Sequence, residues 1–455
     1  MTNPFFPALF PALGLNSETE INVVGEGDMP SAYQTTDLAA ASFGVAGAAI
    51  AAYVNPDSPA PVQVDRRLAS FWYKSSVHPR GWSLPDTWDS VAGDYRASDG
   101  WIRLHTNADA HRAAALSVLK VEEDRKSVAK AVSTWSAVDL ESAVVAAGGC
   151  AAEMRSSEEW ARHPNGAAVA TEPLVHLDTQ PCDAAPISPI SIDPQRPLKG
   201  VRVLDLTKIL AGPMASRFLA AYGADVLRID PPWWKEPSLL AEVTLGKRCA
   251  GLDLRDAEDR RVFEGLLAQC DVFLHGYRAD ALEKLGFGAE ERRALNPGMI
   301  DVSHNAYGWT GPWRNRRGYD SLVQMSSGIA EYGMRQYGAD KPTPLPAQAL
   351  DHATGYFLAT AVIQGLARRR AKGVSTTARL SLSRTARLLV DHISDNSNTS
   401  IGPMTPDDMA PDVEATPWGE LSRNRFPLEI PGCPAIWEYP VGQLRTSPAE
   451  FLDAA

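Results

Sequence analysis

The chain is poor in cysteine. Five cysteines stand far apart among 455 residues, and no two of them have the C-x-x-C spacing of zinc sites and redox motifs. We therefore expect neither a metal site nor a disulfide framework, and we interpret the cysteines as free thiols in a reducing cytoplasm. They are Cys150, Cys182, Cys249, Cys270 and Cys433.

Basic residues are scarce at the start of the chain, where the first Lys or Arg is Arg66. A secretory signal peptide needs a basic n-region, so none is expected. The net charge of −11 argues against nucleic acid or an anionic membrane as the main partner. Residues 38–54 are an uncharged run, but Ala and Gly dominate it, and these are weak hydrophobes. We expect a buried core helix there rather than a membrane span.

The sequence also lacks a G-x-G-x-x-G motif where a nucleotide-binding fold would carry one. Residues 197–232 nevertheless predict a βαβ unit: a strand at 200–206, a small-residue turn at 211–213, a helix at 214–222 and a strand at 224–229. Asp230 follows the second strand, at the position where NAD-binding folds carry the acid that binds the ribose. A Rossmann oxidoreductase is thus an alternative, which the missing glycine motif opposes.

Strands and helices alternate from 198 to about 395, which is typical of a parallel sheet covered on both faces. We predict an α/β fold, with a Rossmann-like doubly wound sheet as the large domain and a smaller α+β domain. In the latter, residues 95–105 predict a hairpin. The predicted division is an N-terminal arm with a degenerate half-repeat of the large domain (1–92), the small domain (93–177), a Pro-rich linker (178–197), the large domain (198–395) and a C-terminal extension (396–455).

Two segments of the chain have similar sequences. TDLAAASFGVAGAAIAAY at 36–53 resembles LDHATGYFLATAVIQGLA at 350–367, and each places Phe six residues after an aspartate. These aspartates are Asp37 and Asp351. Both segments precede a pattern of a short strand and a helix, so we predict an internal repeat.

The second half of the sequence resembles the class III CoA-transferases, which include formyl-CoA transferase, carnitine CoA-transferase and α-methylacyl-CoA racemase. The motifs that carry the resemblance agree in order and spacing over about 160 residues. They are GVRVLDLTKILAGPMAS (200–216), GADVLRID (223–230), GKRCAGLDL (246–254), GYRADALEKLGFG (276–288), LNPGMIDVSHNAYGWTGPW (295–313), RGYDSLVQMSSG (317–328) and LDHATGY (350–356).

The first half resembles a later portion of the same family, in YRASDGWIRLH at 95–105 and MRSSEEWARHP at 154–164. The chain thus looks like one and a half copies in rearranged order, with a degenerate tail half before a nearly complete front half. Family members form interlocked dimers, so the resemblance implies a homodimer of that kind.

The resemblance implies that Asp351 is the catalytic residue. In such enzymes an aspartate attacks the thioester of an acyl-CoA, and an aspartyl anhydride and then an aspartyl-CoA thioester follow. A carboxylate needs positioning and desolvation to act in this way. We expect a helix over 354–369, whose N-terminal amides would stabilise a developing oxyanion. Without the resemblance, Asp351 is simply a helix-start residue. The motif around Asp37 has decayed, so a second active carboxylate there is the weaker interpretation.

Two neighbouring residues are possible supporting groups. Tyr319 stands where the racemase branch has a His, and a phenol with a pKa near 10 is a poor proton shuttle at neutral pH. Tyr319 therefore favours transfer over exchange of an α-proton. Asp320 stands where transferases often carry an acid, although a helix-start charge explains it equally well.

The resemblance also implies a set of residues that bind CoA. The phosphates of CoA need cations and amides, and its adenine needs an apolar slot. Lys208, Leu210 and Pro231 depart from formyl-CoA transferase, which makes a formyl or oxalyl substrate unexpected. The residues carried over are Ala211, Tyr277, Arg278, Lys284 and Arg317.

The sequence therefore predicts a cytoplasmic acyl-CoA:carboxylate CoA-transferase. Its partners would be an acyl-CoA and a small carboxylic acid, with CoA as substrate and no permanently bound cofactor. Two alternatives stay open: a catalytically decayed CoA-binding subunit that pairs with an active partner, and an acyl-CoA racemase or isomerase.

Overall fold

The computed structural model describes residues 3–16, 19–182, 192–278, 280–394 and 399–452. In this part of the chain the largest sheet has seven strands, in the order β10-β9-β8-β11-β12-β13-β7. Strands β8 to β13 pair in parallel, and β7 joins the edge antiparallel to β13. The strands are β7 (His176–Pro181), β8 (Arg202–Leu206), β9 (Asp225–Asp230), β10 (Arg248–Gly251), β11 (Val272–His275), β12 (Ile300–Asn305) and β13 (Val374–Ser381).

The six parallel strands, numbered from β8, follow the order 3-2-1-4-5-6 of doubly wound sheets. This confirms the predicted fold class. In such sheets a ligand binds outside the carboxyl ends of the strands where the order reverses, here between β8 and β11. The predicted βαβ unit is β8, α9 (Ala211–Ala221) and β9. The turn predicted at 211–213 is wrong, because these residues form the first turn of α9, where Pro213 needs no amide partner.

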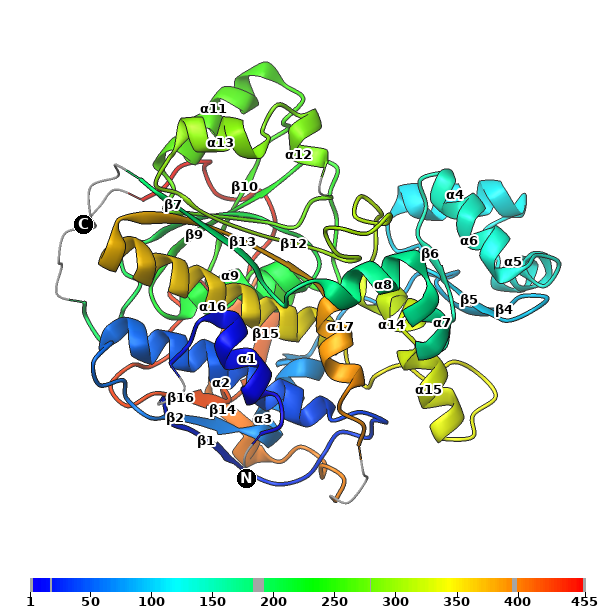
Figure 1. Cartoon of the computed structure of the whole chain (residues 1–455), viewed down its shortest axis with the longest axis horizontal. Coiled ribbons are helices and arrows are strands. Elements are labelled where there is room, and N and C mark those ends of the chain that lie inside the picture. The colour runs from blue at the N-terminus through cyan, green and yellow to red at the C-terminus, as the bar shows by residue number, and fades with distance from the viewer. Residues whose placement is uncertain (1–2, 17–18, 183–191, 279, 395–398, 453–455) are drawn as a thin grey trace.

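Helices cover both faces of the sheet (Figure 1). One face carries α11 (Ala257–Gln269) and α13 (Ala289–Leu295), and the other carries α9 and α16 (Ala349–Lys372). The connections also contain α10 (Leu240–Val243), α12 (Ala281–Lys284), α14 (Asp320–Ser326), α15 (Ile329–Gln336) and α17 (Leu382–Val390).

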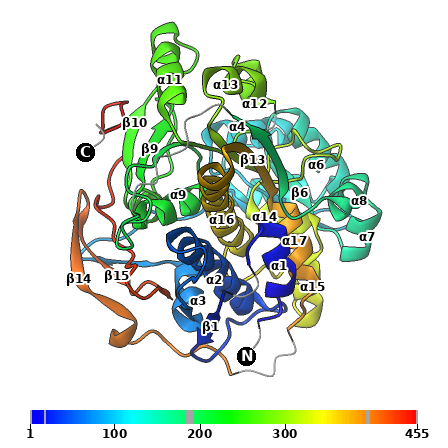
Figure 2. The same cartoon turned by 60° about the vertical axis from the view of Figure 1, so that its left-hand side comes forward.

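A further layer lies below α16, formed by the N-terminal part of the chain (Figure 2). Helix α2 (Thr35–Val54) packs along α16, with α1 (Phe6–Leu13) and α3 (Arg66–Lys74) beside it. By length and composition α2 is apolar enough to cross a membrane, yet 83% of its most apolar stretch is buried within the protein. The predicted buried core helix is thus confirmed.

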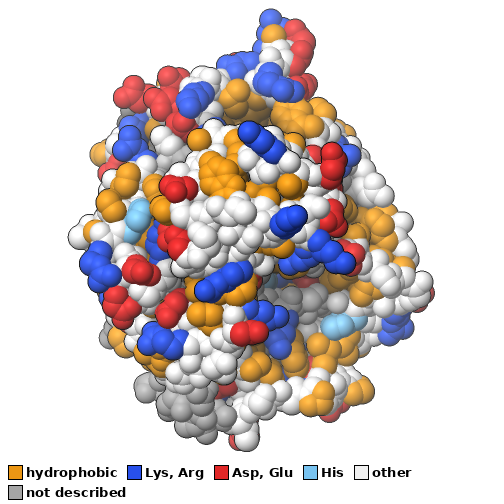
Figure 3. All heavy atoms as spheres, turned by 90° about the vertical axis from the view of Figure 1, so that its right-hand side faces the viewer, with side chains coloured by type: hydrophobic (Ala, Val, Ile, Leu, Met, Phe, Trp, Pro, Cys, Tyr) orange, Lys and Arg blue, Asp and Glu red, His pale blue; other side chains and the backbone are white. Residues whose placement is uncertain are grey.

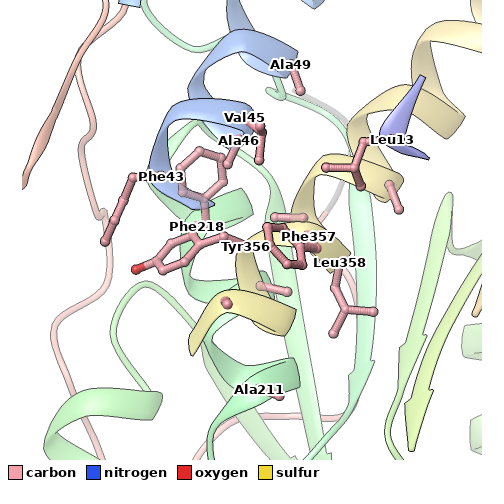
Figure 4. Close-up of a cluster of buried hydrophobic side chains, with 14 of the residues drawn as sticks. Leu13, Phe43, Val45, Ala46, Ala49, Ala211, Phe218, Tyr356, Phe357 and Leu358 are labelled. Atoms are coloured by element: carbon pink, nitrogen blue, oxygen red, sulfur yellow. The ribbon is translucent and has the colours of Figure 1, made fainter. Parts of the chain in front are cut away.

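The shared core of α2, α9 and α16 is built from aromatic and small residues (Figure 4). The rings of Phe43 and Tyr356 lie 4.0 Å apart, and Phe218 meets Tyr356 edge-on at 5.8 Å. Gly355 permits the close approach of α16 to α9, since a Cβ there would lie 2.5 Å from the carbonyl oxygen of Ala211. These contacts join the two halves of the sequence in a single core.

The structure supports the predicted repeat in detail. Asp37 and Asp351 are each the third residue of their helix, and the caps Gln34 and Gln348 have nearly the same backbone angles (φ −73°, ψ 58° and φ −76°, ψ 62°). A strand and a capped helix follow both helices: β2 (Val62–Asp65) with α3, and β13 with α17. Helix α16 begins at Ala349, five residues before the predicted start.

A smaller unit lies to one side of the sheet (Figure 1). The predicted hairpin is confirmed as β4 (Gly93–Arg96) paired antiparallel with β5 (Trp101–Leu104), and β6 (Ala151–Glu153) extends it. Acidic and basic side chains are interspersed over its outer face (Figure 3). Its helices and those that follow are α4 (Asp109–Leu119), α5 (Arg125–Val132), α6 (Ala137–Ala146), α7 (Ser157–Arg162) and α8 (Pro164–Thr171).

The ends of the chain pair with each other in two small sheets. Strand β15 pairs with both β14 and β3, and β2 lies between β1 and β16. Strand β7 runs into the segment predicted as a linker, of which 183–191 lie outside the described residues; the five-part domain division stays a prediction. The elements are β1 (Ile21–Val24), β3 (Val77–Arg80), a 3-10 turn (Pro406–Asp408), β14 (Met409–Thr416), β15 (Gly419–Asn424) and β16 (Leu428–Glu429).

We expect Phe43→Ala to lower the free energy of unfolding by about 3–5 kcal/mol, because the Phe43 ring is fully buried between the two halves. Urea denaturation followed by circular dichroism measures this loss. Val262→Ala on α11 is the control, since Val262 is 41% exposed and should cost about 0.5 kcal/mol or less. Equal effects of the two changes would contradict a shared core.

Candidate active site

A cavity of about 400 Å³ opens at the carboxyl ends of the parallel strands, and we call it the Asp351 cavity. Its walls come from the loops after β8 and β9, from the first turns of α14 and α16, and from the small unit. It lies at the carboxyl edge of the sheet, where doubly wound sheets bind ligands, beside the loop after β8. The lining residues are Asp86, Thr87, Trp88, Asp89, Ser90, His105, Asn107, Ala108, Ile209, Leu210, Trp234, Lys235, Glu236, Pro237, Ser238, Leu239, Tyr319, Asp320, Gln348 and Asp351.

Two buried carboxyl groups meet at this cavity. Asp351 is 7% exposed and Asp320 is 1% exposed. The backbone amide of Asp351 donates a hydrogen bond of 2.9 Å to Oδ2 of Asp320. Asp320 therefore caps the first turn of α16 from another helix. This contact explains why α16 begins earlier than predicted, and it corrects the expected source of oxyanion donors: residue 354 lies inside the helix.

Burial raises the pKa of both groups. The pKa of Asp320 rises to about 6, chiefly through desolvation. The pKa of Asp351 rises well above its usual value through desolvation and then through the charge of Asp320. Two carboxylates in one buried site cannot both ionise at ordinary cost. The pair therefore carries fewer than two negative charges on average. An ionised Asp351 would be poorly solvated and for that reason reactive.

Asp37 occupies the same helical position as Asp351 but has a different neighbour. Its Oδ1 lies 3.0 Å from the guanidinium of Arg66, which also binds Asp28 at 2.6 Å. A cation compensates Asp37, whereas a second carboxyl group lies beside Asp351. This difference favours Asp351 as the reactive member of the repeat.

Tyr319 is held between two histidines of the small unit. Its ring stacks on His105 at 3.7 Å, and its hydroxyl lies 3.4 Å from Nδ1 of His111. Burial raises the pKa of Tyr319 and lowers that of His105 to about 3, so His105 is neutral. Sequence reasoning missed His105 in the cavity wall; the only signal was a histidine at the end of the predicted hairpin.

The turn after β8 is strained. Ile209 has φ +67°, a left-handed conformation that β-branched residues rarely adopt. Its amide donates to Glu236 at 2.9 Å, and Glu236 is held by the buried guanidinium of Arg228. Such strain persists where the surroundings enforce it, and it concentrates at functional sites.

Asp230 does not serve a nucleotide ribose in this structure. It is fully buried and pairs with Arg228 at 2.9 Å. With its oxygens committed to the guanidinium, the oxidoreductase interpretation loses its main residue.

Lys208 marks the point where the loops after β8 and β11 meet. Its Nζ lies 4.6 Å from the ring centre of Trp234 and 4.9 Å from that of Tyr277. Burial lowers the pKa of Lys208 to about 8. In the sequence, Lys208 stands out only as a difference from formyl-CoA transferase. Its position in the structure makes it a candidate contact for an anionic ligand.

The structure brings only part of the CoA-binding set together. Tyr277 and Arg278 are adjacent after β11, and Arg278 lines a second cavity of about 820 Å³. Ala211 is buried at the start of α9. Lys284 is exposed and pairs with Asp280, and Arg317 lies on the small-unit side, 3.4 Å from the carbonyl oxygen of Gly148. Among the residues that the structure describes, none of the five lines the Asp351 cavity. Their role stays a prediction.

Comparison with known proteins places this site in context. Residues 198–410 match the family CoA-transferase family III. The chain is 29% identical over 313 residues to a protein of Gibberella moniliformis named acyl-CoA transferase, which covers 64% of this chain and 54% of that protein. It is 34% identical over 196 residues to the succinyl-CoA:glutarate CoA-transferase of Mus musculus, covering 40% of this chain and 44% of that protein.

A solved structure, that of Rv3272 from M. tuberculosis, is 31% identical and has a TM-score of 0.39, covering 42% of this chain and 57% of that one. The chain thus spans about half the length of the relatives it matches. The matched region contains β8 to β13, both carboxyl groups and the strained turn. Residues 198–410 thus resemble CoA-transferase family III, and this match covers just under half of the chain.

Proposed function

We propose that this protein is an acyl-CoA:carboxylate CoA-transferase that works through a covalent intermediate at Asp351. The observation that carries the proposal is the position of Asp351: a buried carboxyl group with a raised pKa, lining a cavity at the ligand-binding edge of a doubly wound sheet. The similarity of residues 198–410 to CoA-transferase family III supports the same conclusion.

The reaction divides into balanced steps. The Asp351 carboxylate attacks the thioester carbonyl, and the C–S bond breaks. CoA departs as a thiolate, and a mixed anhydride of Asp351 and the acyl group remains. The thiolate then attacks the aspartyl carbonyl, which releases the donor acid and leaves an aspartyl-CoA thioester. The acceptor carboxylate attacks this thioester and expels the thiolate, which finally takes the new acyl group and regenerates Asp351. Covalent catalysis of this kind replaces one difficult transfer by easier ones.

The path proposed for CoA runs from the Asp351 cavity past Lys208 and Tyr277 to Arg278. Lys208 is a half-buried cation between the loops after β8 and β11, and Arg278 lines the larger cavity beyond. Cations at these points suit the diphosphate and 3′-phosphate of CoA. We also propose a homodimer in the cytoplasm and a small carboxylic acid as acceptor; relatives named for acyl-CoA and succinyl-CoA support the substrate class.

A racemase is the second candidate, favoured by one observation. His105 lies in the same cavity as the two carboxyl groups and stacks on Tyr319. A neutral imidazole and a carboxylate form a pair that can exchange an α-proton. Because its pKa is lowered to about 3, His105 is a weak base at neutral pH, so transfer stays the first candidate. A decayed CoA-binding subunit is the third candidate, and it predicts binding of CoA without any modification of Asp351.

We expect hydroxylamine to trap Asp351 as a hydroxamate during incubation with an acyl-CoA, because both proposed intermediates are activated acyl groups. Peptide mass spectrometry locates the label. Asp351→Asn should lose transfer activity by at least about a thousandfold, as expected when a nucleophile is removed.

Asp37→Asn is the matched control for this experiment, since Asp37 holds the equivalent position in α2. It should keep the label at Asp351. A label on any other residue contradicts the mechanism. Deuterium incorporation at the α-carbon in D2O, without transfer, would decide for the racemase.

The carboxyl pair predicts an unusual dependence of stability on pH. Raised pKa values in the folded state favour the protonated groups. The contribution of Asp320 to stability is therefore full below about pH 4 and is lost as the pH rises through about 6, and the contribution of Asp351 is lost in the same direction. Asp351→Asn should therefore raise the free energy of unfolding by about 1–3 kcal/mol at pH 8 and change it little at pH 4. Urea denaturation at the two pH values measures this. Destabilisation by Asp351→Asn at pH 8 would show that the ionised Asp351 carboxylate does not destabilise the folded protein at that pH.

Calorimetry with free CoA tests the ligand class separately from the chemistry. We expect CoA to bind with a Kd of about 1–100 μM and NAD to give no response, because Asp230 is already paired with Arg228. Lys208→Met should weaken CoA binding about tenfold through loss of a half-buried cation. Binding of NAD but not of CoA would refute the proposed function.

A further inference from the structure

The Asp351 cavity has a distinctive distribution of charge. Its described lining contains five acidic residues and a single Lys or Arg, the exposed Lys235. His105 is neutral, since its pKa is lowered to about 3. A second carboxylate on the substrate would thus enter a cavity that offers it almost no positive charge. The acidic residues are Asp86, Asp89, Glu236, Asp320 and Asp351.

Arg103 and Lys208 lie close to the cavity wall but do not line the cavity. Arg103 pairs with Asp94 at 2.7 Å and lies 4.6 Å from the ring centre of Trp88, behind the cavity wall. Lys208 lies between Trp234 and Tyr277. Moving an unpaired carboxylate out of water into such a site is costly.

Part of the remaining wall is apolar or aromatic and is held in place. Trp88 meets His105 edge-on at 5.6 Å, and His105 in turn stacks on Tyr319. Ile209, Leu210 and other aliphatic residues add to this apolar part. The uncharged polar residues of the lining are Thr87, Ser90, Asn107, Ser238 and Gln348. A cavity of about 400 Å³ with such walls has room for an acyl group well beyond acetyl.

We propose that the acyl group transferred by this protein is an uncharged, apolar monocarboxylic acyl group of medium size, and that the cavity discriminates against dicarboxylic acyl groups such as succinyl. Trp88, in the loop before β4, is the specificity-determining residue for the apolar chain. The acidic residues that line the cavity, which we call the acidic rim and which include Asp86, oppose a second carboxylate. The inference rests on the proposed function, because it assumes that CoA presents its thioester to Asp351.

The test compares the binding of hexanoyl-CoA, succinyl-CoA and free CoA to Asp351→Asn by calorimetry, so that no thioester is consumed. We expect hexanoyl-CoA to bind at least about tenfold more tightly than succinyl-CoA. The Asn variant removes an acidic group from the cavity, which makes the comparison lenient toward succinyl-CoA. Equal or tighter binding of succinyl-CoA would overturn the inference.

Two further variants assign the effect to the cavity wall. Trp88→Ala, made in the Asp351→Asn background, should weaken hexanoyl-CoA binding about tenfold and leave acetyl-CoA within about twofold. Asp86→Lys should reduce the ratio of hexanoyl-CoA affinity to succinyl-CoA affinity about three- to tenfold. Asp412→Lys, the same charge change on the distant exposed strand β14, is the control and should leave the preference unchanged. An equal effect of the two lysine variants would refute a local role of the rim.

Failure of the inference is distinguishable from failure of the proposed function. If free CoA binds and succinyl-CoA is preferred, only the inference about the acyl group falls. If neither CoA nor any thioester binds, the proposed function falls and the inference falls with it.

Discussion

Burial of α16 on every side is the constraint on which the site depends. One side of the helix faces the sheet, a second faces α9 across Gly355, and a third faces α2 through the contact of Tyr356 with Phe43. A helix enclosed in this way can present polar groups only near its ends. Asp351 stands in the first turn, so any chemistry of this helix takes place at that end, in the Asp351 cavity.

The neighbour of each aspartate decides what that aspartate can do. Asp37 and Asp351 share a helical position and a cap of the same conformation, but Arg66 compensates one and Asp320 faces the other. An ion pair stabilises a carboxylate and makes it a poorer nucleophile, whereas desolvation beside a like charge raises its pKa and its reactivity. The protein thus accepts a local loss of stability at Asp351 and avoids it at Asp37.

The N-terminal half has a structural and a functional part in this arrangement. Helix α2 covers the apolar side of α16 that the sheet leaves free, and the small unit carries Trp88 and His105 to the cavity wall. Residues 198–410 hold the family motifs, yet the cavity is closed by residues that precede them. A fragment limited to the matched region would expose the buried face of α16 and lack the wall that we propose selects the acyl group.

Local patterns predicted the parallel α/β sheet, the βαβ unit and the repeat, and the family resemblance singled out Asp351, because alternating apolar runs and ordered motifs are properties of neighbouring residues. Only the tertiary structure decided that Asp320 caps α16, that Arg228 takes up Asp230, and that His105 enters the cavity. The five residues expected to bind CoA lie at separate places for the same reason. Burial, charge pairing and the closing of a cavity join residues far apart in the chain, and no periodicity in a sequence records which distant side chains will meet.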